Sequence, residues 1–529
     1  MLFNSYPFIF LFLPIVLGVF LSLAKNNQIK LSYIWLIISS LFFYGWWNFN
    51  YIGLLILSTG INFLIGNLLA KRNKKINPKI ILFIGIIFNL SLLGYYKYAN
   101  FFIENLNILF QSEIFLTKVI LPLGISFFTF QQITYLVDSY YGVVKEKNFL
   151  KYTLFVTFFP QLIAGPIVHH KEILPQFGRK FNNLKKINRD LAIGLSIFIL
   201  GLFKKVVIAD GISSYPNEIF MAAENGITLS FFEAWAGAIA YSLQLYFDFS
   251  GYSDMAVGIA RMFGINLPIN FNSPYKKLNI SEFWRNWHIT LSRLIKEYLW
   301  DPLSLFFTRL AYLKNFNKMN FFITATLIPI LISFFFIGLW HGAGWNFIIF
   351  GLLHGIYISL YSIWAKFIKP KNNRDSFLSS LSSWLVTYLC VVVGWVPFRA
   401  ESFEGLLNYF KSMFLFNGIS VHRFLEGRFG LFEEYIVNFG VKFNGISPNE
   451  FIDFNSISWI IILLITTLFL PNTYEIISKK YIRKPLKVSC SSKKFRWRPS
   501  RIWSLILSTI FFYAIISMRD ISEFLYFQF

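Results

Sequence analysis

Long apolar runs, separated by short polar connections, recur along the whole chain. A helix needs about 20 apolar residues to cross the roughly 30 Å hydrocarbon layer of a bilayer. The runs are continuously apolar, whereas the strands of a membrane barrel alternate apolar and polar residues. The pattern therefore predicts an all-α polytopic membrane protein without β-strands, with about twelve transmembrane helices at about 7–24, 32–48, 51–70, 79–96, 115–136, 190–208, 229–248, 320–339, 344–365, 379–397, 456–474 and 501–518.

The basic residues of the connections predict the orientation of these helices. Lys25 and Lys30 follow the first run and KRNKK follows the third, whereas the connection around WWNFNY has no basic residue. Because Lys and Arg collect in cytoplasmic loops, the N-terminus is predicted to lie outside. The same alternation predicts an outside C-terminus, outside segments at 211–228 and 399–455, and inside segments at 249–319 and 475–501.

The run LKYTLFVTFFPQLIAGPIV, residues 150–168, does not fit this alternation. Basic residues flank it on both sides, namely Lys145, Lys147, Lys171, Arg179, Lys180, Lys185 and Lys186. Pro160, Gly165 and Pro166 would also break a straight helix. We therefore expect a re-entrant or in-plane element, which is tolerated at membrane depth only against protein or a wet cavity.

The predicted cytoplasmic region 249–319 is too long and too apolar for a simple loop. Its segment SEFWRNWHITLSRLIKEYLWDPLSLFF mixes Trp, Leu and Ile with Arg, Lys and His at helical spacing. This mixture predicts amphipathic helices that lie along, or dip into, the cytoplasmic face of the membrane.

Composition agrees with a membrane protein and limits the other classes. Of the 529 residues, 56% are hydrophobic and 14% are charged, against about 25% charged in soluble domains. We attribute the net charge of +23 to the positive-inside rule and not to nucleic-acid binding. Cys390 and Cys490 provide no disulfide framework. The first run has no basic segment before it, so we interpret it as a retained span and not a signal peptide.

His341 is a candidate catalytic residue, because it stands in the tight connection LWHGAGW between two apolar runs. Gly338, Gly342 and Gly344 would let another backbone or a ligand approach it closely. A neutral imidazole can take a proton from a hydroxyl nucleophile and later return one. A histidine that only bonds its neighbours at a helix turn fits the residues equally well, so both interpretations stay open.

Other titratable residues have more ordinary explanations. His288 fits the interface edge of an amphipathic helix, and His354 fits interhelical hydrogen bonding, with substrate contact as its alternative. Asp248 and Asp254 are expected to be buried partners of hydroxyls, backbone amides or Arg261, with a proton relay as the alternative.

The remaining polar groups are expected to serve no chemistry. Lys204, Lys205 and Asp210 end the sixth run, where charged groups snorkel to the membrane interface. His169 and His170 lie in a basic loop, and His422 lies in the outer segment. No HExxH, CxxC or HxH spacing predicts a metal site, and no Walker or GxGxxG loop is present.

Several long motifs, in order along most of the chain, resemble the membrane-bound O-acyltransferase superfamily. Within it they resemble the bacterial branch of alginate O-acetylation proteins and peptidoglycan O-acetyltransferases. The motifs are LPLGISFFTFQQITYLVD (121–138), FFPQLIAGPIV (158–168), YFDFSGYSDMAVGIARMFGI (246–265), NFNSPY (270–275), FWRNWHITLSRLIKEYLWDPL (283–303), IGLWHGAGWNFIIFGLLHG (337–355) and GWVPFRAES (394–402).

The resemblance implies specific roles for these motifs. His341, in the GLWHG element, matches the catalytic histidine of the family, and His288 matches a second histidine that we expect at the donor end of a tunnel. Supporting or tunnel-lining roles are expected for Asp248, Ser250, Tyr252, Ser253, Asp254, Trp284, Trp287, Trp340 and His354. Apart from the resemblance, the charges of Arg285, Arg293, Lys276 and Lys277 could hold the phosphates of CoA; the alternative is that these are solvated residues obeying the positive-inside rule.

The resemblance also implies a fold and a reaction. It predicts a many-helix bundle around a thinned centre, in the bacterial inner membrane, with acetyl-CoA as the donor substrate and no tightly bound cofactor. The acetyl group would cross the lipid bilayer and reach an extracytoplasmic polysaccharide through a partner of the SGNH esterase type. Alginate or another exopolysaccharide is the expected acceptor, and peptidoglycan is the alternative.

We expect a single integral domain over residues 1–529. Its parts are the N-terminal spans (1–112), the acyltransferase core (113–400), the outer segment (401–455) and the C-terminal spans (456–529). Two other classes stay open. One is a secondary transporter in which His and Asp relay protons, and the other is a non-catalytic scaffold that recruits a secreted acetylase.

Overall fold

The computed structural model describes residues 1–71, 76–115, 119–144, 146–178, 183–368, 376–422, 426–430, 432–438, 440–445, 454–477, 496–518 and 522–525. Several residues used above to predict topology, and the second cysteine, lie outside these ranges; they are residues 72–75 of the KRNKK loop, Lys145, Arg179, Lys180, Cys490 and most of the basic segment 475–501.

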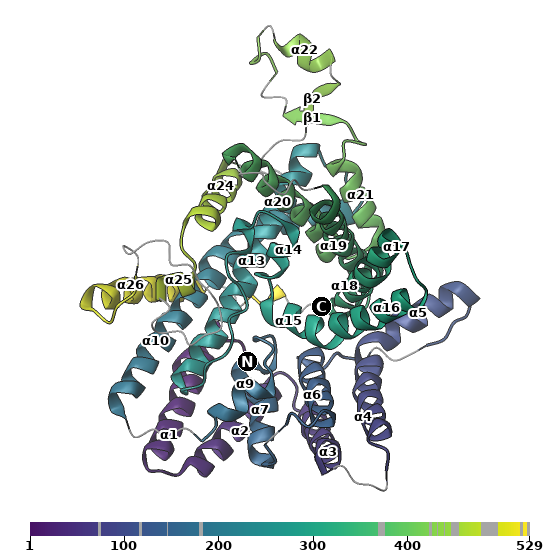
Figure 1. Ribbon diagram of the computed structural model, residues 1–529. Coiled ribbons are helices and arrows are strands. Elements are labelled where there is room, and N and C mark those ends of the chain that lie inside the picture. Colours follow the sequence, from purple (N-terminus) through teal and green to yellow (C-terminus); the bar gives the residue numbers. More distant parts are fainter. Residues whose placement is uncertain are drawn as a thin grey trace.

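The first half of the described chain is helical (Figure 1). In order, its helices are η1 (Pro7–Phe12), α1 (Leu13–Lys25), α2 (Ile29–Gly45), α3 (Tyr51–Lys71), α4 (Pro78–Leu93), η2 (Gly94–Tyr98), α5 (Ala99–Phe110), α6 (Ile125–Tyr140), α7 (Phe149–Thr157), α8 (Phe159–Leu162), α9 (His170–Ile173), η3 (Leu174–Gln176), α10 (Leu184–Phe203), η4 (Lys204–Ala209), α11 (Asp210–Ile212), α12 (Ser214–Glu224) and α13 (Phe231–Met262).

The second half adds more helices and two short strands. In order, they are η5 (Pro274–Lys276), α14 (Ile280–Trp284), α15 (Ile289–Ile295), η6 (Lys296–Trp300), α16 (Asp301–Leu313), α17 (Lys318–Phe322), η7 (Ile323–Leu327), α18 (Ile328–His341), α19 (Trp345–Ile363), η8 (Trp364–Ile368), α20 (Phe377–Arg399), α21 (Phe403–Met413), β1 (Ile419–His422), α22 (Phe432–Asn438), β2 (Val441–Gly445), α24 (Phe454–Phe469), α25 (Thr473–Ile477) and α26 (Arg501–Ser517).

Seven helices of the described ranges are long and apolar enough to cross a membrane, namely Pro7–Lys25, Tyr51–Lys71, Pro78–Phe110, Leu184–Ile212, Lys318–His341, Trp345–Ile368 and Phe377–Arg399. Each predicted apolar run contains a helix, but the predicted count of about twelve spans is not confirmed. The runs at 32–48, 456–474 and 501–518 form apolar helices of 17, 16 and 17 residues. The run at 115–136 becomes helical only at Ile125.

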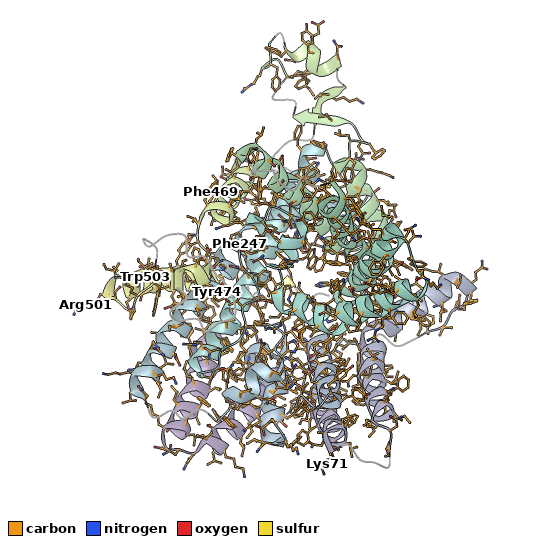
Figure 2. The ribbon with its side chains drawn as sticks, viewed as in Figure 1. Lys71, Phe247, Phe469, Tyr474, Arg501 and Trp503 are labelled. Atoms are coloured by element: carbon orange, nitrogen blue, oxygen red, sulfur yellow. The ribbon has the colours of Figure 1, made fainter. Side chains whose placement is uncertain are left out.

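Large apolar side chains cover the outside of the bundle, as expected of a surface that faces lipid. Ile15 is 55% exposed, Phe83 is 64% exposed and Phe469 is 76% exposed. Figure 2 shows side chains projecting from the outer helices, with Arg501 at the far end of α26, while Phe247 and Tyr474 are buried.

The run at 150–168 is broken, as predicted. Helix α7 ends at Thr157, the four-residue α8 contains Pro160, and the following residues form turns and extended backbone. All residues from 154 to 170 are buried. Helical breaks of this kind need protein around them, because lipid cannot satisfy the freed backbone groups.

Two corrections concern the region predicted to be cytoplasmic and amphipathic. Residues 249–262 continue α13, a single helix of 32 residues, because this stretch contains no proline. Helices α14 and α15 lie inside the bundle, since Phe283 and Leu291 are each 1% exposed. The helical periodicity was correctly predicted. The side chains of Phe283, Trp284 and Trp287 are buried by protein, whereas α16 exposes Phe306 (61%) on one face, as an amphipathic helix does.

Glycines bring α10 and α13 together at the centre of the fold. A Cβ on Gly194 would lie 2.6 Å from the carbonyl oxygen of Gly258, and one on Gly201 would lie 2.7 Å from that of Gly251. Small residues allow such close approach of helix backbones. The second half of α13, which contains most of the motif YFDFSGYSDMAVGIARMFGI, is therefore held directly against α10.

The outer segment departs from the expectation that β-strands are absent. Strands β1 and β2 form a parallel pair, with Ile419 opposite Val441. Figure 1 shows this pair and α22 beyond the helical bundle. Apolar and polar residues alternate along β1 and β2, and both strands lie outside the apolar runs. The prediction of helices was made from those runs and did not apply to this segment.

Candidate active site

The sequence LWHGAGW forms the turn of a tight hairpin between α18 and α19. A Cβ on Gly338 would lie 2.2 Å from the carbonyl oxygen of Phe347, and one on Gly351 would lie 2.2 Å from that of Phe334. At Gly342 the added atom would meet the ring of Phe347 at 2.1 Å. The predicted close approach is confirmed at Gly338 and Gly342, and it is made by protein.

His341 is the last residue of α18 and is only 5% exposed. Its imidazole packs against the rings of Trp340, Phe350 and Phe398, with ring centres 4.9, 5.5 and 5.1 Å away. This aromatic lining excludes water from most of the imidazole, so the ring keeps a fixed orientation.

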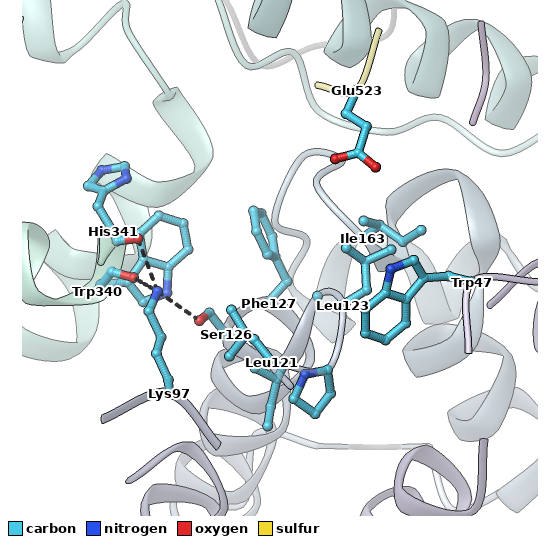
Figure 3. A pocket seen from close by; sticks show the side chains of 13 residues that line it. Trp47, Lys97, Leu121, Leu123, Ser126, Phe127, Ile163, Trp340, His341 and Glu523 are labelled. Atoms are coloured by element: carbon cyan, nitrogen blue, oxygen red, sulfur yellow. Dashed lines mark hydrogen bonds between the residues drawn. The ribbon is translucent and has the colours of Figure 1, made fainter. Parts of the chain in front are cut away.

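A cavity of about 110 Å³ opens beside His341 (Figure 3). Its polar side chains include those of Lys97, Ser126 and Glu523. The wall is completed by Trp47, Leu121, Pro122, Leu123, Gly124, Ile125, Phe127, Ile163 and Trp340. The space is large enough for a small group such as an acetyl group, or for several waters.

Lys97 and Tyr98 were missed by the sequence analysis. Both lie in η2, within the long helix Pro78–Phe110, and both donate hydrogen bonds to the end of α18. The signal was present in the sequence GYYKY, in which a lysine directly follows the predicted apolar run 79–96. Its partner, about 240 residues away, is visible only in the fold.

His288 lies close to His341 but does not line this cavity. It precedes α15 with a φ of 40°, is 0% exposed, and bonds the side-chain oxygen of Asn270 through Nδ1 at 3.0 Å. Its ring centre is 5.9 Å from that of Trp340. The interface position predicted for His288 is therefore wrong, because the loop from 264 to 273 covers it. Burial lowers the pKa of His288 to about 3, so its imidazole is neutral at pH 7.

His354 takes the interhelical role predicted for it. Trp284 donates its indole N–H to His354 Nδ1 at 3.3 Å. A Cβ on Gly394 would lie 2.4 Å from His354 Nε2, so the backbone of α20 passes directly over the imidazole. Trp287 packs on Trp395, with ring centres 4.8 Å apart. Trp284 and Trp287 thus belong to the aromatic core behind His341.

The FDFSGYSD element of α13 forms a buried ionic network, and the predicted snorkelling of the two lysines is wrong. Lys205 Nζ lies 2.6 Å from Asp248 and 2.9 Å from Asp210. Lys204 Nζ lies 2.7 Å from Asp254. These side chains turn inward because the carboxylates of α13 lie opposite them on the tightly packed α10–α13 pair.

The predicted partners of the two aspartates are partly correct. Asp254 accepts a hydrogen bond from the Thr473 hydroxyl at 2.6 Å, and Asp248 accepts one from the Leu525 backbone N–H at 3.2 Å. Arg261 instead pairs with Asp190 at 2.8 Å.

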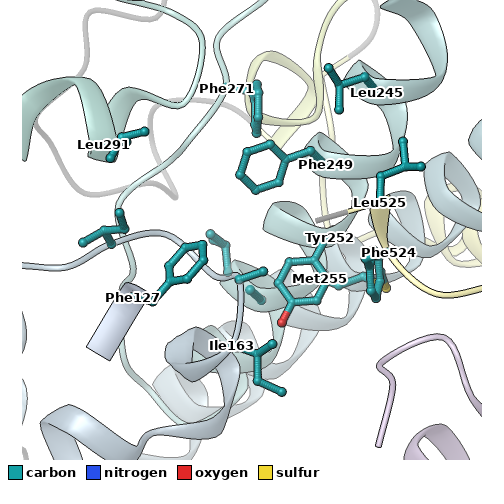
Figure 4. Close-up of a cluster of buried hydrophobic side chains, with 14 of the residues drawn as sticks. Phe127, Ile163, Leu245, Phe249, Tyr252, Met255, Phe271, Leu291, Phe524 and Leu525 are labelled. Carbon is teal, nitrogen blue, oxygen red and sulfur yellow. The ribbon is translucent and has the colours of Figure 1, made fainter. Parts of the chain in front are cut away.

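The remaining residues of this element serve the core. Ser250 and Tyr252 are 1% and 2% exposed, and Tyr252 contacts Phe524 with ring centres 4.3 Å apart (Figure 4). Ser253 accepts a hydrogen bond from Asn270 at 3.3 Å. Since Asn270 also bonds His288, the α13 element supports His288 through one side chain.

The four basic residues expected to bind donor phosphates do not converge. Arg293 binds both oxygens of Glu172, at 2.6 and 2.9 Å. Lys276 donates to the carbonyl oxygen of Leu470 at 2.7 Å. Arg285 is exposed and Lys277 is half-buried. None of the four lines the cavity beside His341.

Within the described ranges, no group of three or more His, Cys, Asp or Glu side chains could hold a metal ion. His169 and His170, expected in a basic loop, are 5% and 3% exposed; His170 lies 3.6 Å from Asp138. His169 packs on Tyr298 and His170 on Tyr135, and neither histidine lines the cavity.

Comparison with known proteins adds a family. A model described as MBOAT, the membrane-bound O-acyltransferase family, matches residues 143–398. The chain is 42% identical to the peptidoglycan O-acetyltransferase of Helicobacter pylori, over 80% of this chain and 81% of that protein. It is 37% identical to the probable alginate O-acetylase AlgI of Pseudomonas aeruginosa, over 79% and 75% of the two chains. A teichoic acid D-alanyltransferase of Bacillus subtilis is 28% identical, over 53% and 69%.

Proposed function

The chain belongs to the membrane-bound O-acyltransferase family and is an acyltransferase, and from that premise we propose that it moves an acetyl group from cytoplasmic acetyl-CoA to an extracytoplasmic polysaccharide. The observation that carries the proposal is a buried histidine, His341, which a glycine hairpin presents to a small polar cavity. Acetyl-CoA is the donor substrate, and no tightly bound cofactor is part of the proposal.

His341 is proposed as the general base. Its imidazole takes the proton of an acceptor hydroxyl while the hydroxyl oxygen attacks the carbonyl carbon of the thioester. A C–O bond forms, the C–S bond breaks, and the proton passes to the departing thiolate of CoA. Positioned proton transfer of this kind contributes about 10²–10⁴ in rate.

The lining of the cavity supports delivery toward the outer side. Trp47, Lys97, the segment 121–127, His341 and Glu523 all belong to connections or helix ends that the positive-inside rule places outside. A CoA molecule cannot cross about 30 Å of hydrocarbon. A buried histidine near the outer end of α18 would let the acetyl group reach the outer side while CoA stays on the cytoplasmic side. We accordingly propose the bacterial inner membrane as the location, with both termini extracytoplasmic.

Relatives suggest the acceptor class. The peptidoglycan O-acetyltransferase and the alginate O-acetylase are both named for polysaccharide O-acetylation. We propose an envelope or secreted polysaccharide, reached through an extracytoplasmic partner of the SGNH esterase type. Identity is 42% to the peptidoglycan enzyme and 37% to the alginate protein, so peptidoglycan should be measured first and exopolysaccharide alongside it.

The test is His341→Ala in the native host. Base-labile acetate on purified peptidoglycan and on secreted polysaccharide should fall to the level of a deletion strain, while immunoblots show normal membrane insertion. His422→Gln is a matched control, because His422 lies in β1, beyond the bundle. Acetate that stays at the wild-type level on every polymer would contradict the proposal and favour the scaffold or transporter interpretations. The transporter interpretation also predicts no transfer from radiolabelled acetyl-CoA by purified protein.

A further inference from the structure

The carboxyl end of α18 has an unusual set of hydrogen-bond partners. The last four carbonyl groups of an α-helix have no intrahelical donor. In α18 they belong to Gly338, Leu339, Trp340 and His341. The Gly338 oxygen accepts from the Gly342 N–H at 3.4 Å. The extended Gly342, with a φ of −160°, ends the helix there, so the other carbonyl groups need donors from elsewhere.

Two neighbouring side chains of the helix Pro78–Phe110 provide those donors. The Tyr98 hydroxyl donates to the Leu339 oxygen at 2.6 Å. Lys97 Nζ donates to the oxygens of Trp340 and His341, at 2.5 and 3.1 Å. Its third contact is the Ser126 hydroxyl, at 3.5 Å (Figure 3). An ammonium group has three N–H donors, so this arrangement uses all of them.

The position of Lys97 is also electrostatically favourable. The carboxyl end of a helix carries a partial negative charge, which a cation stabilises. Lys97 is half-buried, and a cation that is partly removed from water is stabilised by partners of this kind. Lys97 therefore binds the end of α18 more firmly than a neutral donor would.

We propose that Lys97, assisted by Tyr98, is a positioning residue that holds the backbone of His341 and so fixes the position of its imidazole beside the cavity. On the opposite side, the glycine contacts with α19 hold α18 in place. The rings of Trp340, Phe350 and Phe398 orient the imidazole, and the bonds from Lys97 hold the backbone from which it projects. This inference rests on the proposed role of His341 as general base.

The competing role for Lys97 is direct contact with substrate, because the lysine also lines the cavity. The two roles differ in kinetics. A positioning residue acts on the transition state through His341 and lowers kcat, since a misplacement of about 1 Å can cost about 10² in rate. A residue that binds substrate equally in ground and transition states raises KM at unchanged kcat.

The experiment uses everted membrane vesicles that contain the full chain and its native acceptor. Radiolabelled acetyl-CoA is added to the exposed cytoplasmic face, and base-labile label on polymer is followed over a range of acetyl-CoA concentrations. The variants are Lys97→Met, Lys97→Arg and Tyr98→Phe. Lys314→Met and Tyr95→Phe are matched controls, because Lys314 is exposed and Tyr95 is 54% exposed on the same segment as Tyr98.

Lys97→Met should lower kcat by about 10²-fold with KM for acetyl-CoA unchanged. Lys97→Arg should recover part of that loss, since a guanidinium can donate to both carbonyl oxygens. Tyr98→Phe should lower kcat by a smaller factor, and both controls should match wild type. An unchanged kcat in Lys97→Met, or a rise in KM alone, overturns the inference.

Two further outcomes are distinguishable. If Lys97→Met fails to accumulate, Tyr98→Phe decides: a lower kcat at unchanged KM supports the inference, and an unchanged kcat overturns it. If His341→Ala keeps its activity, the proposed function itself fails. If His341→Ala is inactive while Lys97→Met is fully active, only the positioning role of Lys97 fails.

Discussion

Single residues show how a membrane protein accommodates charge. The sequence analysis expected Lys204 and Lys205 to extend toward the interface, but each pairs with an aspartate of α13. At membrane depth a charge is stabilised only by a nearby partner. The packing of α10 on α13 places the carboxylates of Asp254 and Asp248 within reach of the two ammonium groups. The lysine side chains therefore do not need to extend to the membrane interface. Which lysine meets which carboxylate depends on the helix register, which no local pattern contains.

Breaking one of these pairs should destabilise the fold. Asp254→Asn removes the partner of Lys204, and breaking a buried pair costs about 3–5 kcal/mol. The double variant Lys204→Met with Asp254→Asn should recover much of that loss, because no uncompensated charge remains. Thermal unfolding of the purified protein in detergent measures both. Equal loss of stability in the single and double variants would contradict the ionic explanation.

His288 predicts a pH dependence of stability. Its folded-state pKa is about 3, against an ordinary value of 6.5, because burial disfavours the charged form. Below pH 6.5 the unfolded chain therefore binds a proton that the folded protein does not. The free energy of unfolding should fall as the pH decreases from about 6.5 toward 3, by about 1.4 kcal/mol per pH unit from this group, and be unaffected by it above pH 7.

The measurement is the unfolding temperature of wild type and His288→Asn between pH 4 and pH 8. Burial also lowers the pKa of His169, to about 4, so part of the acid slope should remain in the variant. An acid slope that is identical in the two proteins would show that His288 is accessible to protons in the fold.

At the scale of elements, the α18–α19 hairpin connects packing to chemistry. The sequence indicated that the glycines of this hairpin permit close approach. The structure shows that the carbonyl oxygen of Phe347 approaches Gly338 and that of Phe334 approaches Gly351. In contrast, the sequence gives no indication that the donors for the end of α18 come from Pro78–Phe110. Close approach is a local property of glycine, whereas the identity of the partner depends on how distant helices pack.

Gly338→Ala tests the hairpin. Alanine favours an isolated helix over glycine by about 1 kcal/mol, but here its Cβ would lie 2.2 Å from the Phe347 oxygen. The clash should outweigh the propensity and lower both stability and acetyl transfer. Gly53→Ala in α3, where nothing lies within 4 Å of the added Cβ, is the matched control and should be neutral or slightly stabilising. Unfolding temperatures and polymer acetate report the two effects.

At the scale of the molecule, the apolar runs and the family motifs assemble around one centre. The C-terminal residues Phe524 and Leu525 contact Tyr252 and Asp248 of α13, which joins the last segment of the chain to its middle (Figure 4). The described spans number seven, and several other apolar helices are too short or too polar to count among them. Length and hydropathy identify helices but cannot say which of them lipid surrounds.

The predicted orientation can be measured with single cysteines. In a chain without Cys390 and Cys490, Asn50→Cys and Glu113→Cys should react with an impermeant maleimide added to intact spheroplasts. Gln28→Cys and Ile76→Cys should react only after the membrane is permeabilised. All of these positions lie in connections between helices. The opposite pattern would reverse the orientation and with it the proposed direction of acetyl transfer.

The sequence alone determined the helical class, the break at 150–168, the family and the place of His341 at a tight turn, because hydropathy, proline, glycine and ordered motifs are properties of short stretches. Only the tertiary structure decided that His288 is buried under Asn270, that Lys204 and Lys205 turn inward, and that Lys97 binds the end of α18. These features depend on contacts between residues far apart in the chain. The free energy of a buried polar group is set by whichever distant partner the fold brings to it.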